Sequence, residues 1–357
     1  RAIVEENPFS YFGVTRSRDD LVNGDNVTDD DLLHLGATTL ARILDAGAFA
    51  ATDHRAFFAY RLDYGGHQQT GVVGALDVDA LDDGRVLTHE NVRPDRASLL
   101  ARHLEVVGAT SSPIALTHRA DPAMTELVAA ACGREPAVDH EIEQVRHRVW
   151  VLAAEETERL GDFLEDPTVY VTDGHHRAAA AIAAHTAHPD DAAFARTLGV
   201  VFPHDQLRVE AFHRRAPDRD ARTTDELVAA LTTVGTVEAA ADVVAATPTQ
   251  RGEVGVYVAG SWFRLVLDPI ERPSALASLD VERLRRDVLG HVLGVDELAE
   301  RSDVDYVPGP TGVAEMVARC DADHKIGFVM YPTDINDLMA VAAAGELMPP
   351  KSSSFAP

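Results

Sequence analysis

Hydrophobic and polar positions alternate with two different periods along the first half of the chain, which predicts both helices and strands. Apolar residues recur at helical spacing over 29–46, and Gly47 can end that helix in a left-handed conformation. Two strand-like runs, 56–62 and 70–76, are separated by a stretch that contains Gly65-Gly66. Because a Gly-Gly pair readily adopts the turn that joins antiparallel strands, we expect a β-hairpin there.

Short strands and helices continue to alternate from this hairpin to about residue 216. Pro94 begins a helix that Gly108 can end, and an alanine-rich helix that follows 173–177 runs to about Ala187 and stops near Pro189. We also expect a helix over 122–131 and strands over 85–88, 113–116, 145–152, 168–171 and 198–202. The expected fold class is therefore α/β, of the mixed α+β kind.

The character of the sequence changes after Pro217. We expect a helix over 225–231, a pair of strands over 255–258 and 262–267, and an amphipathic helix over 281–293. The last residues, from Pro349 to Ser354, are either a flexible tail or a docking segment. The chain is therefore expected to have two parts, residues 1–216 and residues 217–357.

Composition and charge narrow the classes of function. The chain has 357 residues, and 32 Lys and Arg against 58 Asp and Glu give a formal net charge of 32 − 58 = −26. This charge argues against a general nucleic-acid or anionic-membrane binder, since both need a cationic face. Cys132 and Cys320 lie far apart, so we expect a reducing cytoplasm and no disulfide framework. No apolar run approaches about 18 residues, so no transmembrane helix is expected.

The strongest candidate for chemistry is Asp173-Gly174-His175-His176-Arg177, which lies between an expected strand and an expected helix. Gly174 allows a tight turn, the helix start offers N–H groups and a positive dipole end, and Arg177 can contact two phosphate oxygens at once. In a chain of charge −26, a local cationic turn is where an anion would bind. The alternative is a polar helix cap whose histidines are merely exposed, and spacing alone does not decide between the two.

Two further clusters combine histidine and arginine. His89-Glu90 ends an expected strand and is followed by Arg93, Asp95 and Arg96. A carboxylate at a strand end can act as a general base or bind Mg²⁺, and the two arginines could hold a transferred group. An ordinary surface ion cluster is the alternative. His213-Arg214 ends another strand-like segment, where an exposed strand end is the alternative.

Several common sites are excluded by missing motifs. A zinc site would need three or four ligands, and the chain has neither H-E-x-x-H nor paired C-x-x-C, so no metal ligand is assigned. The P-loop, the Rossmann fingerprint and the nucleophile elbow are missing as well.

Four stretches, in their order along the chain, resemble the DUF1015 family of uncharacterised proteins. They are Val86–Glu90 with Asp95-Arg96, Arg146–Trp150, Tyr170–Arg177 and Gly345–Ser352. The segment from His89-Glu90 to Arg177 is similar to the ParB/sulfiredoxin-like fold, and its motifs resemble those of free serine kinases, which pair an H-E strand end with a D-G-[HT]-H-R turn. The resemblance implies a ParB/sulfiredoxin-like core with additional N-terminal and C-terminal α/β regions.

The resemblance also implies a role for each matching residue. Glu90, with His89 beside it, matches the catalytic glutamate that takes the proton from the substrate hydroxyl. The turn that holds nucleotide phosphates is matched by Asp173, Gly174, His175, His176 and Arg177. The expected contacts to substrate or phosphate are Arg93, Arg96, His213 and Arg214. The implied cofactor is ATP or ADP with Mg²⁺.

We therefore expect residues 1–216 to bind a nucleotide, and the chain to be a cytoplasmic phosphotransferase that acts on a small hydroxyl compound such as free serine. The alternative is a non-catalytic nucleotide-binding switch or scaffold, which would bind nucleotide without forming a phosphorylated product. A DNA-associated role is opposed by the acidic charge and the lack of a basic stripe. The expected partners are thus a nucleotide and a small-molecule substrate, with no nucleic acid and no membrane.

Overall fold

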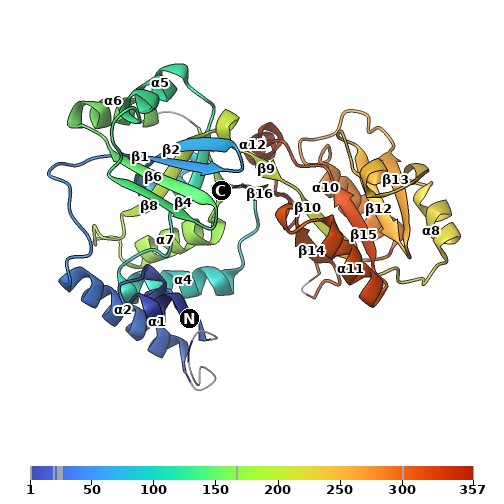
Figure 1. Ribbon diagram of the computed structural model, residues 1–357, viewed down its shortest axis with the longest axis horizontal. Coiled ribbons are helices and arrows are strands. Elements are labelled where there is room, and N and C mark those ends of the chain that lie inside the picture. The colour runs from blue at the N-terminus through green and yellow to red at the C-terminus, as the bar shows by residue number, and fades with distance from the viewer. Residues whose placement is uncertain (1, 19–20, 22–26, 166–167, 300, 357) are drawn as a thin grey trace. The chain divides into compact units, whose positions relative to one another are not determined.

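The computed structural model describes residues 2–18, 21, 27–165, 168–299 and 301–356. This part of the chain is a mixed α/β protein, as predicted, and its internal contacts divide it into two units (Figure 1). Unit 1 contains the residues up to Leu87 and Val92–Gln206. Unit 2 contains Thr88–Asn91 and Leu207–Ala356. A short excursion of the chain, Thr88–Asn91, therefore belongs to unit 2 although the residues on both sides of it belong to unit 1.

Unit 1 is built around an eight-stranded sheet with the strand order β3-β7-β4-β8-β2-β1-β6-β5 among the described residues. Its strands are β1 (Phe58–Tyr64), β2 (His67–Asp77), β3 (Val86–Leu87), β4 (Ile114–His118), β5 (Val138–Ile142), β6 (Val145–Val151), β7 (Val169–Asp173) and β8 (Arg196–Pro203). Its helices are α1 (Ala2–Glu6), η1 (Tyr11–Gly13), α2 (Asp29–Asp45), α3 (Asp79–Asp82), α4 (Pro94–Val107), α5 (Pro122–Ala131), α6 (Ala154–Leu164), α7 (His175–Ala187) and η4 (His204–Gln206). In Figure 1, α5 and α6 cover one face of the sheet and α4 and α7 the other.

Turn and cap residues define many of these elements where the sequence predicted them. Gly65 and Gly66 both have positive φ angles, 55° and 80°, and they join β1 and β2 in the expected antiparallel hairpin. Gly108 ends α4 in the left-handed conformation with φ 73°. Thr28 begins α2 with a capping box, and Gly47 follows its end with φ 69°.

The core of unit 1 joins the sheet to both layers of helices. Its buried members include Ile114 on β4, Trp150 on β6, Leu160 on α6, Val171 on β7 and Ala181 on α7. Most of the central strands carry apolar residues on both faces, because helices cover both faces of the sheet. The strand β5 at the sheet edge is exposed along its whole length.

Unit 2 contains a six-stranded antiparallel sheet with the order β11-β13-β12-β15-β10-β14 in the described residues, and the small pair β16-β9. Its strands are β9 (Val209–Glu210), β10 (Phe212–Ala216), β11 (Gly235–Ala240), β12 (Glu253–Val258), β13 (Ser261–Leu267), β14 (Asp305–Pro308), β15 (Ile326–Met330) and β16 (Ser354–Phe355). Its helices are α8 (Thr224–Leu231), α9 (Val243–Ala246), α10 (Asp280–Arg283), η5 (Leu284–Val292), η6 (Gly309–Thr311), α11 (Val313–Asp323) and α12 (Ile335–Ala343).

Two features of unit 2 differ from the expected pattern. The sequence suggested a change of domain at residue 216, whereas the units divide after Gln206, because β10 pairs with β14 and β15 of the second sheet. The expected helix over 281–293 begins as α10 and continues as η5 with wider turns, in which the Leu293 N–H donates to the Val288 carbonyl five residues back.

The C-terminal residues form a docked segment, which was one of the two expected alternatives. Met348 and Ser352 are buried, and β16 pairs with β9. The Met348 N–H donates to the His89 carbonyl at 2.8 Å, so the docked segment holds the excursion Thr88–Asn91 in unit 2. No helix in the described ranges is both long enough and apolar enough to cross a lipid bilayer.

Candidate functional site

Two helices of unit 1 begin at the same edge of its sheet. Strands β3 and β7 are parallel neighbours, with Leu87 opposite Tyr170, and each is followed along the chain by a helix, α4 or α7. The backbone N–H of Arg93, at the start of α4, donates to Nε2 of His176, in the first turn of α7, at 3.1 Å. The positive dipole ends of both helices therefore meet at the carboxyl edge of two parallel strands, where α/β proteins commonly bind anions.

The two helix starts differ in charge, and the difference favours α7 as the anion site. The first turn of α4 contains Asp95, whose pKa is lowered by hydrogen bonds from the Arg93 side chain and the Arg96 backbone. The first turn of α7 contains no acidic residue, and its N-cap, Gly174, supplies no side-chain cap. The dipole of α4 is thus balanced by a carboxylate within its own first turn, whereas the carboxylate beside α7, that of Asp173, precedes the N-cap and is paired with Arg177.

The Arg177 guanidinium occupies the space that a side chain at position 174 would fill, so this position needs glycine. Gly174 has a φ angle of 96°, and a Cβ atom added there would lie 2.8 Å from Nη2 of Arg177. The guanidinium lies against the turn and donates from Nη2 to Asp173 Oδ2 at 2.7 Å, while its buried Nε makes no hydrogen bond to any described residue. Because a guanidinium has five donors, Arg177 can bind a phosphate oxygen while it keeps its bond to Asp173.

The two histidines of the turn are neutral in this arrangement. His175 is only 3% exposed, and burial lowers its pKa to about 4, so its imidazole is uncharged at pH 7. In His176, Nε2 accepts the Arg93 N–H and therefore carries no proton, which places the proton of the neutral ring on Nδ1. The positive charge of the turn thus comes from Arg177 and the helix dipole rather than from the histidines.

The two arginines expected beside the turn lie at the start of α4. Arg93 donates from Nη2 to Asp95 at 2.8 Å, and both side chains are exposed. Arg96, one turn further on, is exposed as well. The backbone of Arg93 contacts the α7 turn through His176, so the structure brings this part of the predicted cluster together.

The predicted catalytic pair lies in the other unit. His89 is 2% exposed and Glu90 is partly buried, and both belong to the excursion Thr88–Asn91 of unit 2. The turn Asp173–Arg177 belongs to unit 1.

His213 and Arg214 have partners within unit 2. The Arg214 side chain is fully buried and donates from Nε to Glu297 at 3.1 Å and from Nη1 to the Phe212 carbonyl at 2.8 Å. Its Nη2 reaches the carbonyls of Pro350 and Lys351 at 3.2 and 3.3 Å. His213 accepts the Met330 N–H on Nδ1, and burial lowers its pKa to about 4. Arg214 thus holds the docked C-terminal segment, and the expected contact of His213 and Arg214 with substrate or phosphate stays a prediction.

A family model described as a protein of unknown function, DUF1015, matches residues 1–282. The chain belongs to the DUF1015 family. No curated protein matches this DUF1015 chain.

Some solved structures are similar to it at low identity. A mutant of free serine kinase in complex with ADP is 14% identical, with a TM-score of 0.38, and the match covers 80% of this chain and 87% of that one. SbnI with a C-terminal truncation, from Staphylococcus aureus, is 11% identical, with a TM-score of 0.39 and coverage of 80% and 82%. A conserved hypothetical protein from Pyrococcus furiosus is 12% identical, with a TM-score of 0.37 and coverage of 86% and 93%. Because the identities and TM-scores are this low, these matches assign no function to any residue of the DUF1015 chain.

Sequence reasoning missed the residues that surround Arg214. Glu297 accepts from its Nε, and the Tyr306 ring lies with its centroid 5.5 Å from the guanidinium carbon. Burial, followed by the neighbouring Glu297, raises the pKa of Tyr306. No motif marks either residue, because Glu297 is 83 positions from Arg214 in the chain and only the fold brings them together.

The residues that the structure describes include no group of three or more His, Cys, Asp or Glu side chains placed to hold a metal ion. Mg²⁺ in nucleotide sites usually keeps several waters and takes only one or two protein carboxylates, the remaining ligands being phosphate oxygens. At the α7 turn, the exposed carboxylate of Asp173 could supply one such ligand. The residues present therefore fit a magnesium ion that arrives with a nucleotide, rather than a site closed by protein ligands.

Proposed function

We propose that this DUF1015 protein binds a nucleotide by its phosphates at the start of α7 and transfers a phosphoryl group from it to the hydroxyl of a small compound such as free serine. The observation that carries the proposal is the turn Asp173–Arg177, where an uncapped helix start meets a guanidinium that has a donor to spare while it is paired with Asp173. In a chain of net charge −26, an anion would need such a cluster of donors in which the carboxylate is already paired.

The choice of a nucleotide rests on the motif. The stretch Asp173-Gly174-His175-His176-Arg177 resembles the turn that holds nucleotide phosphates in the free serine kinases, and the proposal assigns unit 1 a ParB/sulfiredoxin-like core on the same ground. Phosphate oxygens would accept from Arg177 and from first-turn N–H groups of α7. The exposed Arg93 and Arg96 at the adjoining start of α4 would contact the outer phosphates.

Glu90 would act as the general base. It precedes Arg93 by three residues, so an extended backbone keeps their Cα atoms within about 11 Å of each other. The Arg93 backbone is itself hydrogen-bonded to the α7 turn. In the proposed step, the substrate hydroxyl oxygen attacks the terminal phosphorus, its proton passes to Glu90, and the bond from phosphorus to the leaving nucleotide oxygen breaks.

His89 and Mg²⁺ would assist without taking part in the proton transfer. The His89 carbonyl is held by the Met348 N–H, and this contact would fix the backbone that carries Glu90. Mg²⁺ would neutralise charge on the phosphates when bound, and Asp173 is the protein carboxylate nearest to them in the proposal. Cys132 and Cys320 are both free thiols, and the proposal places the activity in the cytoplasm.

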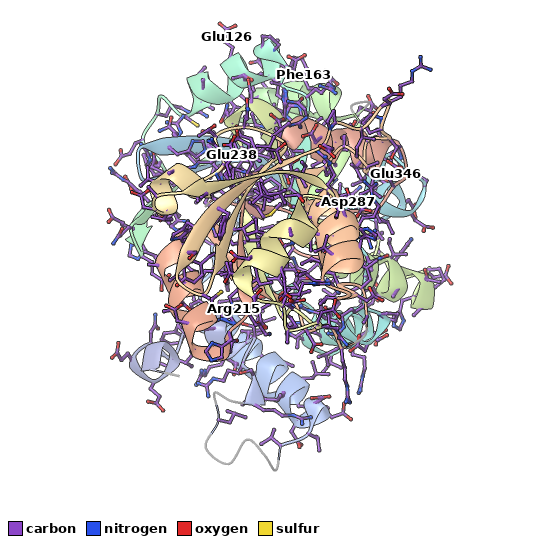
Figure 2. All side chains as sticks on the ribbon, turned by 90° about the vertical axis from the view of Figure 1, so that its right-hand side faces the viewer. Glu126, Phe163, Arg215, Glu238, Asp287 and Glu346 are labelled. Carbon is purple, nitrogen blue, oxygen red and sulfur yellow. The ribbon has the colours of Figure 1, made fainter. Side chains whose placement is uncertain are left out.

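The test compares Glu90→Gln with a control at Glu126, an exposed carboxylate on α5 (Figure 2). Phosphorus NMR would follow ATP and ADP with serine and other hydroxyl compounds, and calorimetry would measure nucleotide binding. Glu90→Gln should slow transfer by about 10²–10⁴-fold and leave the nucleotide Kd nearly unchanged, because it removes only the base. Glu126→Gln should match the unmodified protein in both assays. Normal turnover by Glu90→Gln would contradict the role of Glu90.

A non-catalytic nucleotide switch or scaffold is the second candidate. It is favoured by the excursion Thr88–Asn91, which links the strand beside the turn to the docked C-terminal segment of unit 2. A nucleotide at the turn could then change how this segment is held. The two candidates are separated by the same assay: a switch binds nucleotide and yields no phosphorylated product with any hydroxyl compound.

A further inference from the structure

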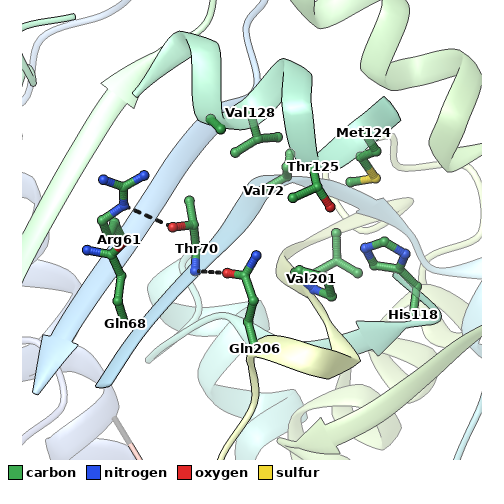
Figure 3. A pocket seen from close by; sticks show the side chains of 12 residues that line it. Arg61, Gln68, Thr70, Val72, His118, Met124, Thr125, Val128, Val201 and Gln206 are labelled. Carbon is green, nitrogen blue, oxygen red and sulfur yellow. Dashed lines mark hydrogen bonds between the residues drawn. The ribbon is translucent and has the colours of Figure 1, made fainter. Parts of the chain in front are cut away.

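A cavity lined by both polar and apolar side chains lies in unit 1, between α5 and the sheet. It measures about 210 Å³ and is lined by residues of β1, β2, β4, β8, α5 and η4 (Figure 3). It is separate from the α7 turn, because His118, which lines it, pairs with Val169 at the start of β7, whereas the turn follows Asp173 at the other end of that strand. The cavity also lies on the face of the sheet that α5 covers, opposite α7.

One side of the cavity gathers hydrogen-bond donors. Arg61 donates from Nε to the Thr70 hydroxyl at 3.0 Å, so that hydroxyl keeps its own proton to donate. The carbonyl oxygen of the Gln206 side chain accepts the Thr70 N–H at 2.8 Å, which leaves its NH₂ group as a further donor. Figure 3 shows these three side chains together at one side of the cavity. A guanidinium, a hydroxyl and an amide NH₂ in one place suit the oxygens of a carboxylate.

Arg61 shares its counter-charge, the Asp63 carboxylate, with Arg148. Its partner in the strand register, Arg148, is ion-paired with Asp63 at 2.6 Å. Both guanidinium groups lie over the Trp150 ring, at 5.2 and 5.7 Å from its centroid. Within the described residues, Arg61 has no ion pair of its own, and none of the residues that line the cavity is acidic. An anionic ligand would supply the missing charge.

The other side of the cavity offers an acceptor. His118 is 3% exposed, and its Nδ1 lies 2.7 Å from the Arg119 carbonyl, which can only accept, so Nδ1 carries the proton. In the neutral ring Nε2 is then a lone pair, and it is buried without a hydrogen bond to any described residue. Figure 3 shows this imidazole beside Met124 at the cavity. A ligand that places a hydroxyl donor there would satisfy the buried nitrogen.

The rest of the lining is apolar and limits the size of the ligand. Val72, Met124, Val128 and Val201 form this part of the wall. A cavity of about 150 Å³ can hold a benzene molecule, so this one has room for a slightly larger compound. The cavity lining contains no carboxylate that could pair with an ammonium group, which disfavours zwitterionic amino acids as ligands.

We propose that this cavity is a binding site for a small hydroxy carboxylate with a branched aliphatic body. Arg61, Thr70 and Gln206 hold the carboxylate, Nε2 of His118 accepts a hydrogen bond from the hydroxyl, and the valine-lined wall contacts the aliphatic part. The site is independent of the nucleotide turn, and it assigns unit 1 a second small ligand that the proposed phosphotransfer does not require.

A matched series of ligands tests this assignment on the unmodified protein. The series is 2-hydroxyisovalerate, isovalerate without the hydroxyl, valine with an ammonium in its place, and the methyl ester of 2-hydroxyisovalerate without the charge. The readout is the NMR signal of ¹³C-methyl-labelled methionine, because Met124 lines the cavity and the other four of the five methionines lie in unit 2. 2-Hydroxyisovalerate should shift the Met124 signal saturably, and each analogue should bind about tenfold more weakly or worse.

Variants locate the interaction. Arg61→Gln should weaken binding of 2-hydroxyisovalerate about tenfold or more, whereas Arg85→Gln, at an exposed arginine of unit 1 that pairs with Asp83 outside the cavity lining, should leave it unchanged. His118→Leu should remove the preference for the hydroxy acid over isovalerate. If a variant fails to fold, the ligand series on the unmodified protein still tests the proposed site. The proposal is overturned if no compound moves the Met124 signal, if valine binds as tightly as the hydroxy acid, or if Arg85→Gln weakens binding as much as Arg61→Gln. Because no nucleotide is added, these outcomes are separate from the fate of the proposed kinase activity.

Discussion

Replacing Gly174 by alanine should weaken nucleotide binding through a side chain that the mutation does not touch. The backbone at Gly174 has a φ angle of 96°, and an added Cβ would lie 2.8 and 2.9 Å from Nη2 and Nε of Arg177. Two effects are therefore combined in one substitution. The first is backbone strain at a conformation that favours glycine, and the second is displacement of the guanidinium from the turn.

The two effects differ in what they change. A non-glycine residue held at such a φ angle costs about 1–3 kcal/mol of folding free energy, and each kcal/mol lowers Tm by about 2–4 °C in a domain of this size. The guanidinium is the far end of a flexible side chain, so moving it adds little further loss of stability. Moving the Arg177 guanidinium away from the proposed phosphate site removes charged hydrogen bonds worth about 1.5–3 kcal/mol. This corresponds to about a 10- to 150-fold increase in the nucleotide Kd.

Gly84 provides the matched control. It also lies in unit 1, has a φ angle of 87°, and has no atom within 4 Å of an added Cβ. Gly84→Ala therefore has the backbone strain without the collision. Urea unfolding should give similar losses of stability for Gly84→Ala and Gly174→Ala, while calorimetry with ATP and ADP should give a weakened Kd for Gly174→Ala alone.

Two results would refute this reasoning. Equal nucleotide affinity of Gly174→Ala and the unmodified protein would mean that Arg177 does not contact the phosphates. A loss of affinity in Gly84→Ala as large as in Gly174→Ala would mean that the effect comes from general destabilisation of unit 1. Combining Gly174→Ala with Arg177→Ala adds a check, because the glycine substitution should then have no further effect on the Kd.

Further outcomes can be expected from buried groups in each unit. His175 and His213 have a pKa lowered to about 4 by burial, while an unfolded histidine titrates near 6.5. The unfolded state therefore binds more protons between these pH values, so stability that is fully present above pH 6.5 is lost as the pH falls toward 4, by about 3 kcal/mol for each histidine. Urea unfolding at a series of pH values should show this loss, and His213→Gln should reduce it in unit 2; an unchanged slope would contradict the assignment. Glu297→Ala should destabilise unit 2 by about 3–5 kcal/mol, because it leaves Arg214 buried without its charge partner. The double variant Arg214→Met with Glu297→Leu should recover most of that loss in the same assay, and a double variant no more stable than Glu297→Ala would argue against an unpaired charge as the cause.

Local chemistry explains which parts of the fold could be predicted from the sequence. The hairpin at Gly65-Gly66 and the end of α4 at Gly108 depend on φ angles that few residues other than glycine adopt easily, so the sequence marks them directly. Helix α5 begins at Pro122 behind a capping Asp121 and was predicted with its observed bounds. Strand β5 was missed, because it is an exposed edge strand whose residues show no apolar alternation.

Long-range pairing explains what could not be predicted. The turn Asp173–Arg177 was identified because its chemistry is contained within five consecutive residues. Apart from the neighbouring Phe212 carbonyl, the hydrogen-bond partners of Arg214 lie 83 and more than 130 positions away, and nothing in the local sequence distinguishes a buried arginine from an exposed one. The same holds for the cavity beside α5, where Arg61 and His118 come from separate strands and show no motif.

The excursion Thr88–Asn91 has a consequence for how this chain can be divided. The polypeptide passes from one unit to the other after Leu87, returns after Asn91 and passes again after Gln206. A single proteolytic nick after Gln206 would therefore place Thr88–Asn91 and its Met348 partner on different fragments, and an excised N-terminal fragment would carry a loop whose Met348 partner had been removed. Replacing one unit by that of a related protein would break the same contact. We therefore expect the two units to evolve and to be expressed together.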